Sequence, residues 1–325
     1  MKNWIFLLPL LVFLSACKQK KELPPTPLYS DSIEAKSFDG RPLELIHDPP
    51  AIRIKKDSLL QIALQNYNID SSKLENIIWL GRRLSYLTRY REAIAIYSSG
   101  IKKHPNAPEL YRHRGHRFLS TRQTQKAIND LTKASELIKG QVIKIEPDGL
   151  PNRINQPLSS LQFNIWYHLG LAHYLQQDFK EAQAAYEQCL TFSTNPDLLC
   201  ATTDWLYMTY RRQGLSKKAN KLLENISEDM RLVENAAYHK RLLMYKGLYR
   251  PEAILITDNV AADRQLDLAT QGYGVGNWYL YNGEAHKAVD IFQRILDTSY
   301  WPAFGYIAAE ADLEYLHSRL PELFE

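Results

Sequence analysis

The chain has 325 residues, of which 45% are hydrophobic and 23% are charged, the balance of a globular protein with a substantial core. Its 40 lysines and arginines exceed its 36 aspartates and glutamates by only 4, a surplus too small to indicate nucleic-acid binding. The length allows one elongated domain or two compact ones.

The first 17 residues, MKNWIFLLPLLVFLSAC, have the features of a targeting segment. An apolar run over residues 4–14 follows Lys2 and is shorter than the ~20 residues that a membrane-spanning helix needs. The run ends in LSAC, which resembles the lipobox of bacterial lipoproteins. The resemblance implies that residues 1–16 are a signal peptide and that Cys17 is lipidated and anchors the mature chain to a membrane. The alternative is an ordinary secretory signal with an incidental cysteine.

Residues 17–56 combine prolines, charges and turn-forming residues without a sustained apolar period. This composition predicts an extended, proline-rich tether, with a short edge strand at 43–46 as the alternative. A helical stripe of apolar residues starts after Asp57, and Asp57 or Ser58 is its expected cap. The folded domain is therefore expected over residues 57–325.

From residue 74 onward the chain repeats itself. Gly81 and Gly115 are 34 residues apart, and so are Ala93 and Ala127. Weaker copies of the pattern follow, and their marker residues are Gly170, Ala182 and Tyr186, then Leu206, Ala219 and Leu223, then Ala253, then Gly276, Ala288 and Phe292. Each unit reads as two amphipathic helices that cannot bury their apolar stripes alone, so neighbouring units are expected to stack.

The 34-residue period, with small residues at the eighth and twentieth positions, resembles the tetratricopeptide repeat over residues 74–300. The resemblance implies an all-α, right-handed solenoid of about six helix-turn-helix repeats. We expect a capping helix near residues 302–320. Bulky residues such as Tyr97, Tyr186 and Phe292 are expected to fill the space between neighbouring units.

The segment GYGVGNW at residues 272–278 has three alternating glycines, a feature that invites comparison with phosphate-binding loops. Its spacing is GxGxG rather than GxGxxG, and a charged helical stretch precedes it instead of an apolar strand. Gly276 occupies the eighth position of the last repeat. The glycines therefore predict close helix packing rather than nucleotide binding.

Between the second and third repeats the spacing grows, because Gly115 and Gly170 are 55 residues apart, which leaves 21 extra residues at about 140–160. Alternation in the sequence VIKI at 142–145 indicates an extended segment that lies along the solenoid. A tolerated surface insertion is the alternative, and long insertions in compact repeats are often functional.

We find no motif for catalysis, no metal-ligand set and no cofactor-binding signature in the sequence. His113 and His116 lie on one helix but among arginines, which would repel a cation. Cys189 and Cys200 fall in apolar helical contexts, where they pack as free thiols or form a disulfide. The sequence predicts a protein that is not an enzyme and uses no cofactor.

In repeats of the family it resembles, positions two, five, nine, twelve and thirteen face a concave groove. Arginine, asparagine and tyrosine dominate these positions here, a set that suits peptide binding. The predicted groove residues are Arg82, Tyr86, Arg112, His116, Asn164, Tyr167, Tyr174, Asp204, Arg211, Arg212, Asn235, Tyr238, Tyr245, Lys246, Tyr273, Asn277 and Tyr281.

These features favour a membrane-anchored scaffold or adaptor of the bacterial envelope, facing the periplasm or the cell surface. Its groove is expected to bind an extended or acidic protein segment. The alternative is an acidic envelope ligand, a polysaccharide or peptidoglycan fragment, on the same surface. No nucleic-acid partner is expected, and the sequence leaves the oligomeric state open.

Overall fold

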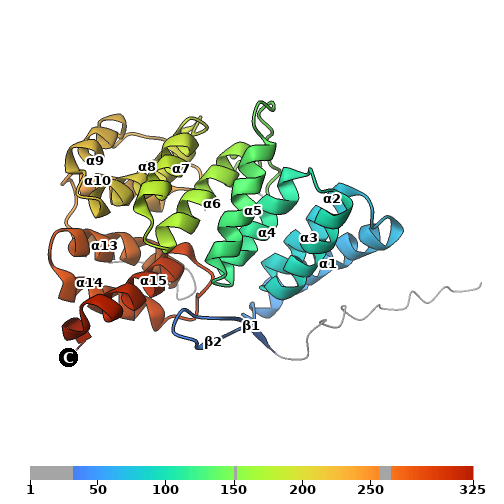
Figure 1. Cartoon of the computed structure of the whole chain (residues 1–325), viewed down its shortest axis with the longest axis horizontal. Coiled ribbons are helices and arrows are strands. Elements are labelled where there is room, and N and C mark those ends of the chain that lie inside the picture. The colour runs from blue at the N-terminus through green and yellow to red at the C-terminus, as the bar shows by residue number, and fades with distance from the viewer. Residues whose placement is uncertain (1–31, 150–151, 256–264, 325) are drawn as a thin grey trace, which may run out of the picture.

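The computed structural model describes residues 32–149, 152–255 and 265–324. Within these ranges it is a stack of antiparallel helices (Figure 1). The six pairs are α2 (Leu74–Tyr86) with α3 (Tyr90–Lys103), α4 (Pro108–Ser120) with α5 (Thr124–Leu137), α6 (Leu161–Leu175) with α7 (Phe179–Leu190), α8 (Pro196–Arg212) with α9 (Ser216–Leu222), α10 (Ala236–Tyr245) with α11 (Pro251–Leu255), and α13 (Tyr273–Tyr281) with α14 (Ala285–Leu296).

Other elements flank these pairs. The helix α1 (Pro50–Ile69) precedes the first pair, and α15 (Phe304–Arg319) follows the last. Short 3-10 turns form at Leu223–Asn225 and Pro321–Phe324, and a π-helical turn at Leu268–Gly272 leads into α13. The prediction of an all-α solenoid with about six helix pairs and a C-terminal capping helix is confirmed.

Glycine in the first helix of a pair faces a bulky side chain of the second helix, 16 positions later. A Cβ atom at Gly170 would lie 2.7 Å from the ring of Tyr186, and one at Gly276 would lie 2.5 Å from Phe292. Gly81 meets Tyr97 in the same way. The alanines at the twentieth position, Ala93, Ala127, Ala182, Ala219 and Ala288, are fully buried.

These contacts explain the repeat pattern, since the two helices approach closely only where one of them lacks a side chain. They also refine one expectation. Tyr97 and Tyr186 fill the space inside their own pair and, in addition, stack on His113 and Trp205 of the next pair. In the degenerate fifth pair, Ala253 is exposed and its neighbour Ile254 is buried instead, so Ala253 is not the packing residue that we expected.

The segment expected to be a tether contains a β-hairpin. The strands β1 (Ile33–Lys36) and β2 (Pro42–Glu44) pair antiparallel and bury Ala35 and Leu43. The predicted helix starts earlier than expected, at Pro50 and not after Asp57, because proline has the fixed φ and the missing N–H that suit a first helical turn. The predicted signal peptide and Cys17 lie outside the described residues.

The hairpin joins the two ends of the solenoid, as Figure 1 shows beneath the helix stack. On one side, the backbone N–H of Ile46 donates to the Thr88 hydroxyl, 3.0 Å away, in the first pair. On the other side, the N–H of Phe38 donates to Glu310 of α15 at 2.6 Å, and the Trp301 indole donates to the Glu44 carbonyl at 2.8 Å. Residues that are far apart in the sequence are therefore held together.

In the described part of the chain, no helix has the length and apolar character needed to cross a bilayer.

Candidate binding groove

The first helices of the first three pairs, α2, α4 and α6, lie side by side and form one polar surface. Arg82 and Tyr86 come from α2, Arg112 from α4 and Asn164 from α6. These four predicted groove residues surround a cavity of about 290 Å³. The structure therefore brings together four of the predicted residues of the first three repeats, from positions up to 82 residues apart in the chain, while His116, Tyr167 and Tyr174 lie elsewhere.

The inserted segment lies in this groove. Glu146 is 8% exposed. One carboxylate oxygen forms an ion pair with the Arg112 guanidinium at 3.1 Å, and the other lies 3.4 Å from Nε2 of His113. The side-chain amide of Asn164 donates a further hydrogen bond to the carboxylate. Residues on two separate helices, α4 and α6, thus hold one carboxylate of the insertion.

The backbone around Glu146 is extended. Its N–H donates to the Ser159 carbonyl at 3.0 Å, and the N–H of Leu161 donates to the Lys144 carbonyl at 2.7 Å. Further along, the guanidinium of Arg83 donates to the Gly149 carbonyl at 2.8 Å, and a Cβ atom at Gly149 would overlap the Tyr86 hydroxyl. Glycine at this position allows the inserted chain to pass directly over Tyr86.

The charges of the groove explain why a carboxylate lies there. Burial lowers the pKa of Arg112, the Glu146 charge opposes this, and Arg82 and Arg117 lower it further. Burial, reinforced by the neighbouring arginines, also holds the pKa of His113 well below its ordinary value. His113 is therefore neutral at pH 7, and Glu146 directly balances the charge of Arg112.

A second cavity of about 420 Å³ adjoins Glu146 on the side of α2. Its apolar lining comes from Leu74, Ile78 and Trp79 and from Ile145 of the insertion, which remains 55% exposed. The guanidinium of Arg82 lies 4.6 Å from the centre of the Trp79 ring, within cation–π range. The inserted segment places a carboxylate in the groove but leaves this apolar space beside it open.

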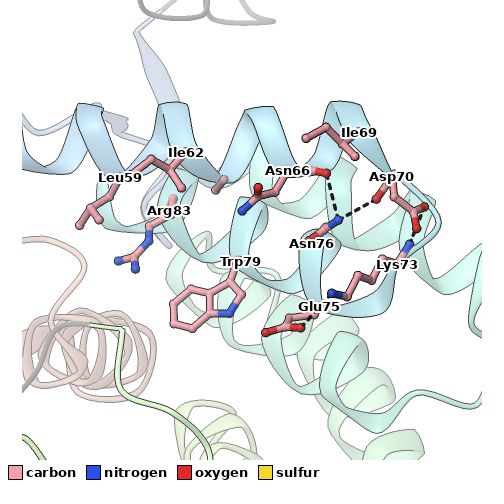
Figure 2. Close-up of a pocket in the computed structure, with 11 residues that line it drawn as sticks. Leu59, Ile62, Asn66, Ile69, Asp70, Lys73, Glu75, Asn76, Trp79 and Arg83 are labelled. Carbon is pink, nitrogen blue, oxygen red and sulfur yellow. Dashed lines mark hydrogen bonds and ion pairs between the residues drawn. The ribbon is translucent and has the colours of Figure 1, made fainter.

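On the other side of Trp79, a cavity of about 500 Å³ lies between α1 and α2. Figure 2 shows Trp79 and Arg83 projecting from α2 on the side of Leu59 and Ile62 of α1. The side-chain amide of Asn76 donates to two backbone carbonyls, those of Asn66 and Asp70, each at 2.9 Å, and so fixes the two helices to each other. Trp79 therefore stands between two open cavities at the N-terminal end of the groove.

The centre of the predicted groove is closed. Asp312 of α15 accepts from the Arg212 guanidinium at 2.9 Å and from the Tyr273 hydroxyl at 3.0 Å. The Tyr273 hydroxyl lies 2.8 Å from that of Tyr174, which also accepts from Asn277 at 2.7 Å. Four predicted groove residues thus surround an internal carboxylate of the capping helix, where a partner does not reach them.

A second buried network lies between α6, α8 and α10. Asp204 and Arg241 form an ion pair, with 0% and 1% of their side chains exposed. Burial raises the pKa of Asp204 to about 6, and the Arg241 charge opposes this rise. The Tyr167 hydroxyl donates to that of Tyr238 at 3.3 Å, and Tyr245 is buried as well. Of these predicted groove residues, only Tyr238 is partly accessible.

The remaining predicted residues do not meet at one common site. Arg211 stacks on Tyr281 at 4.3 Å, and Lys246 donates to the Ile226 carbonyl. Asn235 donates to the Asp197 carbonyl, a contact that joins the start of α10 to the start of α8. His116 packs between His168 and Phe304 and does not face an open groove.

Sequence reasoning missed four charged residues whose contacts fill or close the predicted groove or fix the fold around it: Glu146, Glu310, Asp312 and Arg241. Glu146 carried a usable signal, since it lies in an insertion with extended character. Asp312 and Glu310 did so too, because two carboxylates interrupt an alanine-rich helix whose other residues are largely buried. Arg241 gave no signal, because its partner Asp204 is on another helix and the pairing has no sequence pattern.

No group of three or more His, Cys, Asp or Glu side chains suited to a metal ion occurs among the described residues. Cys189 and Cys200 are buried free thiols, and burial raises the pKa of each to about 12. They pack as apolar side chains and are not joined to each other.

Parts of the chain are similar to known proteins. Residues 163–195, which correspond to the third helix pair, match the tetratricopeptide repeat family. No curated protein matches the sequence. Among solved structures, MamA is 16% identical, with a TM-score of 0.41 over 62% of this chain and 89% of that one. YrrB, described as a TPR protein with an unusual peptide-binding site, is 14% identical, with a TM-score of 0.41 over 77% and 97%.

A tetratricopeptide repeat protein from Parabacteroides merdae is 15% identical, with a TM-score of 0.42 over 78% of this chain and 90% of that one. The family match covers one helix pair, and the other five pairs follow the same helix-turn-helix plan. The chain is therefore an all-α solenoid of helix pairs, and its third pair, at residues 163–195, is similar to the tetratricopeptide repeat.

Proposed function

We propose that the protein is a non-catalytic scaffold that binds an extended, acidic segment of a protein partner. The binding surface is the groove over α2, α4 and α6. One observation carries this proposal: Arg112, His113 and Asn164 already hold the carboxylate of an extended segment, Glu146. Charge-assisted bonds from arginine are strong and directional, so the same groups suit a partner's carboxylate.

We further propose that the scaffold works at a bacterial envelope membrane, anchored through a lipid on Cys17. The LSAC motif after an apolar run supports this location. Two or more acyl chains anchor a protein stably, since each buried CH₂ contributes ~0.8 kcal/mol.

Photocrosslinking in cells tests the binding proposal. A photoreactive residue at position 86 lies in the groove, and one at the exposed Lys180 on α7 is the matched control. We expect one dominant envelope protein to be captured at position 86 and not at position 180. The Arg82→Glu substitution should reduce its capture. Glycan adducts alone at position 86, or identical products at both positions, would overturn the proposal.

A further inference from the structure

We propose that residues 144–149 act as an internal ligand, and that the true partner displaces them with a segment of the same chemistry. This segment has a carboxylate in the place of Glu146, and directly before it an aromatic residue in the place of Ile145. The inference rests on the proposed function and specifies which segment the groove selects.

The carboxylate position is selective because its surroundings are buried and positive. Glu146 meets Arg112, His113 and Asn164 at one point, and only one of them, Arg112, is charged at neutral pH. A neutral amide in place of the carboxylate would leave the Arg112 charge unbalanced in a site that is largely shielded from water. The groove therefore discriminates glutamate from glutamine.

The position before Glu146, that of Ile145, does not fill the cavity beside it. Ile145 is half exposed beside the cavity of about 420 Å³, which Leu74, Ile78 and Trp79 line. An aromatic side chain buries more apolar area than isoleucine and can pack against Trp79. A partner with such a residue gains contacts that the internal segment does not make.

The internal segment is held by polar contacts and buries little apolar surface, so a partner that buries more can replace it. Lys144 pairs with Glu109, but the lysine side chain is 59% exposed, and exposed ion pairs contribute little. Val142 is 89% exposed, and Ile143 is exposed as well. Lys144 also bonds to α6 through its backbone, since its N–H donates to the Gln162 side chain at 3.1 Å and its carbonyl accepts from Leu161 at 2.7 Å. Beyond these contacts, the Gly149 carbonyl accepts from Arg83, and Gly149 passes over Tyr86.

The test uses the full chain with residues 144–158 replaced by a short Gly-Ser linker, and a fluorescein-labelled peptide of sequence VIKIEPDG, which is residues 142–149. We expect this peptide to bind the linker variant and not the intact protein, as measured by fluorescence anisotropy. The Glu146→Gln change in the peptide should weaken binding by about tenfold or more, because a charge-assisted contact is lost. The Ile145→Trp change should tighten it several-fold.

A point variant allows the same test if the linker variant does not fold. The Glu146→Ala substitution in the otherwise intact chain releases the carboxylate from the groove, and the labelled peptide should then bind measurably. Glu136→Ala, an exposed carboxylate on α5, is the matched control and should not permit binding.

Two results would overturn the inference: no peptide binding to a folded linker variant or to Glu146→Ala, or equal binding of the glutamate and glutamine peptides. Either result leaves the scaffold function intact if a protein is still captured from position 86 in cells. The failure of the internal-ligand proposal and that of the scaffold proposal are therefore distinguishable.

Discussion

Single glycines control how closely the paired helices pack. Replacing Gly170 with alanine adds a Cβ atom 2.7 Å from the Tyr186 ring, too close for undisturbed packing. Alanine favours a helix by up to ~1 kcal/mol over glycine, whereas overpacking costs about 1–3 kcal/mol. We expect Gly170→Ala to lower the free energy of unfolding in urea, while Lys180→Ala on the exposed face leaves it within ~0.5 kcal/mol. A more stable Gly170→Ala protein would contradict the close contact.

The buried pair of Asp204 and Arg241 makes a second residue-scale prediction. Asp204→Ala leaves the Arg241 charge buried without its carboxylate, and such uncompensated charges cost about 3–5 kcal/mol. Thermal and urea unfolding should both report this loss. The exposed pair of Lys287 and Glu284 is the control, and Lys287→Ala should change stability by about 1 kcal/mol or less. Comparable effects at the two pairs would show that Asp204 does not stabilise the fold as proposed.

At the scale of helices, α4 and α6 enclose three neutral histidines. Burial, assisted by nearby arginines, holds the pKa of His113, His116 and His168 well below the ordinary value of 6.5. Below pH 6.5 the unfolded chain takes up protons that the folded chain excludes. Stability is therefore expected to fall as the pH drops, by up to ~1.4 kcal/mol per pH unit for each histidine.

Carboxyl groups with raised pKa values, those of Glu34, Asp130, Asp148 and Asp204, oppose this trend. The pKa of Asp204 is raised to about 6 in the folded state, so between the ordinary carboxyl pKa and 6 it gives stability that is lost as the pH rises. We expect the three histidines to outweigh these carboxyl groups above pH 5.5, so urea midpoints at pH 7.5 and 5.5 should show a clear loss at the lower pH. His116→Phe should reduce the slope, and a wild-type stability that does not change between these pH values would contradict the prediction.

The helix pairs were predictable from the sequence because their packing is local. Gly81 and Tyr97, or Gly170 and Tyr186, belong to adjacent helices, so the same spacing recurs in the chain. The closure of the central groove was not predictable. Asp312 meets Arg212 and Tyr273 only because α15 folds back on the stack, and no periodicity records a contact between such distant residues. For the same reason Tyr174 and Asn277 have groove positions in the repeat pattern but lie inside the protein.

For the molecule as a whole, the proposed membrane anchor makes a direct prediction. Cys17→Ser should abolish labelling by a palmitate analogue and move the protein from the membrane pellet to the soluble fraction, because the acyl chains supply the anchoring energy. Cys200→Ser, at a buried thiol, is the control and should leave both labelling and fractionation unchanged. Retention of Cys17→Ser in the pellet, with the label intact, would contradict the lipid anchor.

The hairpin has a mechanical consequence for the solenoid. In most repeat arrays each unit contacts only its neighbours, so the two ends move independently and the array can extend or tighten. Here the hairpin segment contacts both ends of the array, since the N–H of Ile46, just after β2, donates to Thr88 in the first pair, and the N–H of Phe38, in the turn, donates to Glu310 in the last helix. We expect these contacts to limit how far the array can extend or tighten. Under the proposed function, it is then the partner's segment that adapts its shape on binding.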